Sequence, residues 1–159
     1  MRNERVGLAT VAAYARSVLD HFRTVRHAFP LTLSARLPFL DIRVKLEEGT
    51  LAESIRRNFV QEAGDAPRPN AEQMEIVVAH AGMEGVPPPA SWAADEPYRP
   101  HEIASLLDAE GMRASYFHDL DYWQILDVAG GFGVQLMRDP DGYPPWEPCA
   151  PMRPFLHWH

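Results

Sequence analysis

The amino-acid sequence predicts a single α+β domain over residues 1–159, in which a mainly antiparallel sheet packs against about three helices. Three observations favour this fold class. The chain has the length of one domain, and 46% of its residues are hydrophobic, which is enough for a sizeable core. Helix-like and strand-like periodicities alternate along the chain. Near the end, three strand-like segments follow one another with only short turns between them, which is typical of antiparallel pairing.

The first predicted element is an amphipathic helix between Val6 and Val25. Its apolar residues recur every three or four positions and therefore share one face of a helix. They are Leu8, Val11, Ala12, Ala15, Val18, Leu19 and Phe22. Pro38 marks a break, and the residues from Phe39 to Leu46 then alternate between apolar and charged side chains. This alternation predicts a half-buried strand.

A second helix is predicted for the segment from Thr50 to Gly64. Thr50 and Glu53 have the spacing of a capping box, and Gly64 supplies a stop signal. The next segment, from Met74 to Gly82, is a short apolar run with several β-branched residues. Such a run predicts a buried strand.

The segment from Val86 to Pro100 predicts a surface loop, because its prolines remove backbone donors and prevent a helix from continuing. We expect Trp92 to hold this loop against the domain. A third helix is predicted from His101 to Glu110, before Gly111. The three strands that follow are predicted at residues 113–117, 122–128 and 132–137.

Charge and cysteine content exclude several classes of function. The net charge of −7 argues against a nucleic-acid partner, which needs clustered Lys and Arg to displace counterions from phosphates. The single cysteine, Cys149, has no internal disulfide partner, so nothing requires an oxidising compartment. Charged residues interrupt the first apolar stretch, which predicts neither a signal sequence nor a membrane-spanning helix. We therefore expect a cytoplasmic protein with no nucleic-acid and no membrane partner.

The candidate catalytic residues are His118, Asp119 and Asp121 of the segment HDLD, together with His80. Imidazole and carboxylate groups are the types that bind metals and transfer protons. Their spacing matches no established metal site, however, and aspartates in a tight turn commonly hydrogen-bond to their own backbone. We therefore expect HDLD to form a turn, with no bound metal and no cofactor.

Two other segments have a chemical and a structural interpretation. The glycines of GGFG, Gly130 to Gly133, would let backbone amides approach a phosphate. A phosphate loop leaves a strand and opens a helix, whereas strand-like runs flank these glycines, so a hairpin turn is predicted. Cys149 lies between Pro148 and Ala150 and is expected to behave as a small apolar residue rather than as a nucleophile.

The end of the chain carries a family resemblance. The run VQLMR is followed by DPDGYPPW and then, through spaced prolines, by MRPFLHWH. This stretch, Val134 to Trp158, resembles the region that precedes the phosphate loop in bacterial proteins related to HPr kinase. The resemblance implies that this chain is similar to the N-terminal domain of such a protein. It implies no kinase activity for these residues, because the Gly-x-x-x-x-Gly-Lys-Ser/Thr loop that would bind ATP and magnesium does not occur in the sequence.

The same tail supplies the candidate partner-binding residues, Trp146, Phe155, His157 and Trp158. Prolines restrict the backbone of this segment, and its aromatic side chains offer large apolar areas. They can pack on the domain or bind a partner. We expect Trp146 to pack on the domain and Trp158 to face a partner.

Three functions from different classes remain. The leading hypothesis is a non-catalytic recognition domain that binds a protein or peptide, or the rest of a longer kinase-like chain. The second is a small stand-alone enzyme that uses the histidine and aspartate residues named above, with or without a metal. The third is an inhibitor or immunity-type protein whose acidic surface covers a basic target.

Overall fold

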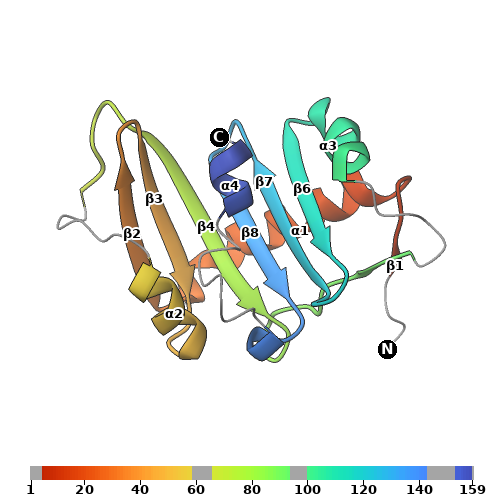
Figure 1. Cartoon of the computed structure of the whole chain (residues 1–159), viewed down its shortest axis with the longest axis horizontal. Coiled ribbons are helices and arrows are strands. Elements are labelled where there is room, and N and C mark those ends of the chain that lie inside the picture. Colours follow the sequence, from red (N-terminus) through yellow and green to blue (C-terminus); the bar gives the residue numbers. More distant parts are fainter. Residues whose placement is uncertain (1–4, 59–65, 94–99, 143–152, 159) are drawn as a thin grey trace.

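A computed structural model describes residues 5–58, 66–93, 100–142 and 153–158 (Figure 1). The strands are β1 Arg5–Val6, β2 Leu31–Leu37, β3 Leu40–Leu46, β4 Glu72–His80, β5 Ser91–Trp92, β6 Met112–Phe117, β7 Tyr122–Asp127 and β8 Phe132–Met137. The helices are α1 Val11–Val25, α2 Thr50–Asn58, α3 Pro100–Asp108 and α4 Arg153–Trp158, with short 3-10 turns at Arg26–Ala28 and Pro140–Gly142. The predicted α+β class is confirmed. No helix in these ranges is both long and apolar enough to cross a membrane.

Six strands form one sheet in the order β2-β3-β4-β8-β7-β6. The outer pairs are antiparallel, as predicted, whereas β3, β4 and β8 run parallel to one another at the centre. The parallel centre arises because long connections separate these three strands in the sequence, and only such connections can return the chain in the same direction. β1 and β5 form a separate two-stranded parallel sheet.

The edge strand β2 was not predicted. Its residues alternate, with Leu33 and Ala35 buried and Thr32 exposed, which is the pattern of a half-buried strand. Pro38 and Phe39 make the two-residue turn into β3, and Phe39 is 80% exposed. Pro38 therefore directly follows strand β2 and begins the turn into β3.

The two faces of the sheet carry separate cores, which we call the α1 face and the α2 face. In Figure 1, α1 passes behind the sheet, while α2 and α4 lie in front of it. On β7, Trp123 and Ile125 belong to the core of the α1 face, and Tyr122 and Leu126 to that of the α2 face. Both cores thus follow from the alternation of side chains along each strand.

An ion pair anchors the loop that enters β4. Asp41 is only 7% exposed, and its carboxylate accepts hydrogen bonds from the Arg68 backbone N–H at 2.9 Å and from Arg68 Nε at 2.8 Å. The side-chain amide of Gln73 donates to the same carboxylate at 3.2 Å. These bonds, led by the Arg68 backbone N–H, lower the pKa of Asp41 from 3.8 to about 2, against the opposing effect of burial.

This pKa predicts a stability that depends on pH. A carboxyl whose pKa is lower in the folded state stabilises the fold above its unfolded pKa, and the contribution is lost as the pH falls through the folded value. Wild type should therefore exceed Asp41→Asn in stability at neutral pH, and the difference should shrink between pH 3.8 and about 2. Urea melts of both proteins across this range measure it. A difference that stays constant down to the lower limit would contradict the assignment.

Candidate functional site

The HDLD segment forms the turn between β6 and β7, as expected. Asp121 has a φ of +48°, in the left-handed region that aspartate tolerates better than most residues. Its carboxylate accepts hydrogen bonds from the Tyr116 hydroxyl and from Arg138 Nε, and from Ser91 Oγ at 3.3 Å. The turn is therefore fixed by contacts to β6, to the end of β8 and to β5.

These contacts make Asp121 part of a structural network. Burial, followed by the hydrogen bond to Asp121 and its negative charge, raises the pKa of Tyr116 to about 12. Tyr116 therefore keeps its proton and continues to donate to Asp121 at any physiological pH. Asp119 and His118 are exposed on the same turn, where the His118 ring lies edge-on to Tyr116.

His80 lies at the other candidate position, the carboxyl end of β4. Its Nδ1 is 3.0 Å from the Ala81 carbonyl oxygen, so in the neutral ring Nδ1 carries the proton and Nε2 is the basic nitrogen. Nε2 is 3.9 Å from the Glu47 carboxylate, too far for a hydrogen bond. The two residues border a cavity of about 120 Å³, which Thr50 and Asp141 also line. It lies where parallel strands end, a common position for ligands, but holds only a very small group.

The structure does not bring His80 and the HDLD residues into one site. His80 follows Val78 on the α2 face by strand alternation, whereas Asp121 reaches Ser91 on the α1 face. Within the described ranges, no three histidine, cysteine, aspartate or glutamate side chains gather so that they could hold a metal ion.

The tail residues have different surroundings. Trp146 and Cys149 lie outside the described residues. Phe155 is fully buried against β8, where a Cβ on Gly133 would come within 2.7 Å of its ring. Trp158 is half-buried and lies edge-on to Phe155, and His157 is exposed. Phe155 thus belongs to the core rather than to a surface.

The described residues form a larger groove on the α1 face, between α1 and the loop that precedes β5. Its volume is about 400 Å³, within the range of sites that bind small molecules or peptide side chains. The buried residues Val6, Val18 and Leu136 form an apolar floor. The remaining lining residues, of which several are polar, are Arg5, Thr10, Ala13, Tyr14, Ser17, His21, Pro87 and Pro88.

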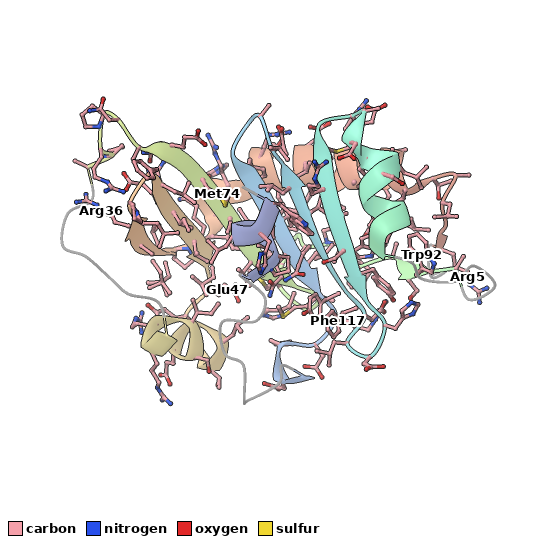
Figure 2. The ribbon with its side chains drawn as sticks, turned by 45° about the horizontal axis from the view of Figure 1, so that its top comes forward. Arg5, Arg36, Glu47, Met74, Trp92 and Phe117 are labelled. Atoms are coloured by element: carbon pink, nitrogen blue, oxygen red, sulfur yellow. The ribbon has the colours of Figure 1, made fainter. Side chains whose placement is uncertain are left out.

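Hydrogen bonds hold the wall of this groove in place. The Ala90 N–H donates to the Tyr14 hydroxyl at 2.9 Å, and Trp123 Nε1 donates to the Ala90 carbonyl at 2.7 Å. Arg138 Nη2 donates to the Pro89 carbonyl at 2.9 Å. Trp92 is buried, as expected, and Figure 2 shows it near Arg5 at the β1–β5 end of the molecule. Since prolines also restrict the backbone, the groove is pre-formed.

The groove was missed in the sequence because its walls are about seventy residues apart. One local signal does point to it. Ala13 and Ser17 are small and exposed at a spacing of four on this amphipathic helix, and His21 follows at the same spacing. Small side chains on one line of a helix leave room for another chain.

Comparisons of the chain with protein-family models, with curated proteins and with solved structures gave no match.

Proposed function

We propose that this chain is a non-catalytic recognition domain that binds an extended protein segment in the groove between α1 and Pro87–Pro88. The end of the chain resembles HPr-kinase-like proteins, and in such a protein this domain would precede the nucleotide-binding core. The observation that carries the proposal is the pre-formed groove, whose wall is held by side chains of α1, β7 and the end of β8. A rigid wall lowers the entropy lost when a partner binds.

The dimensions of the groove favour an extended segment. Its lining along α1 runs from the N-cap residue Thr10 to His21, which corresponds to about 16 Å along a helix axis. That is the length of about five residues of extended chain. The apolar floor would accept side chains, while Ser17, His21 and Arg5 at the rim offer hydrogen bonds. This combination suits a peptide better than a compact ligand.

The chemistry of the groove favours binding over catalysis. Among the described residues that line it there is no carboxylate to pair with a general base. His21 Nε2 lies 3.2 Å from the Gly85 carbonyl oxygen, a contact that ties the ring to the loop before β5. The exposed His157 and the half-buried Trp158 provide a second surface on the α2 face, but Phe155 is buried and not available there.

Filling the groove is expected to weaken peptide binding without affecting the fold. Peptides selected from a random display library on the wild-type domain would serve as the probe. Ser17→Trp places a large ring on the groove side of α1 and should weaken peptide binding by about tenfold or more, since the floor is then covered. Fluorescence titration measures the affinity, and thermal melts check that the fold is retained.

Thr24→Trp is the matched control, because Thr24 is also exposed on α1 but does not line the groove. It should leave the affinity unchanged. Selected peptides that bind Ser17→Trp as tightly as wild type would overturn the proposal, as would a failure to select any saturable binder.

A further inference from the structure

We infer that the part of the α1 face formed by β2 and β3 binds an acidic segment of a protein partner, with Arg43 and Lys45 as the recognising charges. We call this surface the basic face and define it by Thr32, Ser34, Arg43 and Lys45. It is distinct from the groove and does not depend on the function proposed for it.

Strand alternation points these four side chains to the same side. Their neighbours Leu33, Ile42 and Val44 are buried in the core of the α2 face, so the intervening residues point the opposite way. The register places Ser34 beside Arg43 and Thr32 beside Lys45. α1 packs on β7 and β8, toward the other edge of the sheet, and Figure 1 shows no helix behind β2. All four side chains are therefore at least partly accessible to solvent.

Two carboxylates that neighbour the basic face in the sheet, Asp41 and Glu75, are paired with other cations. Asp41, the cross-strand neighbour of Arg36, is bound by Arg68. Glu75, which lies beside Arg43 in the β3–β4 register, accepts from Arg26 at 3.3 Å. Within the described residues, neither Arg43 nor Lys45 has a carboxylate of its own. Arg43 and Lys45 thus form a local positive charge on a chain whose net charge is −7.

Charge complementarity therefore selects an anionic partner, and the composition of the face selects a protein. Carboxylates suit the Arg43 guanidinium, which can bind them in a bidentate manner, and the hydroxyls of Thr32 and Ser34 can donate to further carboxylate oxygens. Single-stranded nucleic acids bind on aromatic side chains, and none of the described residues that point outward from β2 and β3 is aromatic.

The test is a titration with a fluorescein-labelled peptide of alternating glutamate and serine, longer than β3, followed by anisotropy at low and high salt. Wild type should bind saturably, and salt should weaken the binding by screening. The double charge reversal Arg43→Glu with Lys45→Glu should weaken it by about tenfold or more, because attraction becomes repulsion at two positions.

The matched control is Arg56→Glu with Arg57→Glu, which changes the net charge equally on the exposed side of α2. It should alter the affinity by less than about threefold, since these positions are exposed and remote from the basic face. Ser17→Trp should bind the acidic peptide as tightly as wild type does. A failure of the groove proposal can therefore be distinguished from a failure of this inference. Equal losses in both double variants, or no saturable binding by wild type, would overturn the inference. A single-stranded oligonucleotide that binds more tightly and depends on Arg43 and Lys45 would overturn it too.

Discussion

Replacing Phe155 by alanine is expected to lower the free energy of unfolding by about 3–5 kcal/mol, the range for a fully buried phenylalanine. Phe155 is a buried residue of α4, and it packs in the core of the α2 face over Gly133. Its removal leaves a cavity in this core. The free energy of unfolding in urea measures the effect. A loss below about 1 kcal/mol would mean that α4 does not contribute to the stability of the core.

Two variants serve as controls for this prediction. Leu156 is 43% exposed on the same helix, and Leu156→Ala should change stability by less than about 0.5 kcal/mol. Gly133→Ala should be destabilising in wild type, because its methyl group would meet the Phe155 ring at 2.7 Å. In the Phe155→Ala background the clash with the ring is gone and only the Ile125 backbone oxygen remains close, at 3.3 Å, so the two effects should not add. Additive losses would place Phe155 away from Gly133.

Gly131→Ala is expected to cost about 3 kcal/mol, because it combines backbone strain with overpacking. Gly131 has a φ of +59°, and a Cβ there would lie 2.3 Å from the backbone oxygen of Gln73. Its own carbonyl accepts the Glu75 N–H at 2.8 Å, so the β7–β8 turn is held against the start of β4. The added Cβ would clash with a backbone atom, and moving either segment aside would break the hydrogen bond between Glu75 and Gly131. Urea melts again provide the measurement.

Gly111→Ala separates the cost of backbone strain from the cost of overpacking. Gly111 also has a positive φ, +70°, but no atom lies within 4 Å of its would-be Cβ. This variant should therefore show only the cost of the left-handed conformation, about 1–2 kcal/mol. A loss at Gly131 no larger than that at Gly111 would show that the approach to β4 is unimportant.

These glycines explain the GGFG segment in structural terms. The hairpin turn predicted from its flanking strands is present between β7 and β8. Within it, the Gly130 N–H donates to the Asp127 carboxylate at 3.0 Å, Gly131 leaves room for β4, and Gly133 leaves room for Phe155. Two of the glycines are thus needed because of tertiary neighbours that lie far away in the sequence.

The sequence by itself determined the local elements. The apolar spacing of α1 and the alternation of β3 each depend on residues that lie within a few positions of one another. Such patterns reflect the helical and strand periods directly. The HDLD turn belongs to the same class, because aspartates shape the backbone next to them. The helix of the first segment begins at Val11 rather than at Val6, since Val6 pairs with Trp92 in β1–β5.

Only the tertiary structure decided how these elements meet. The parallel centre of the sheet depends on pairing between strands from three distant segments, and local periodicity carries no information on partners or direction. The partners of Asp121 lie as far away as Ser91 and Arg138. The groove requires α1 and Pro87–Pro88 to face each other, and the basic face is uncompensated only because Asp41 and Glu75 are bound by other residues. Packing and charge neutralisation are pairwise properties of distant residues, so they become defined only when the chain is folded.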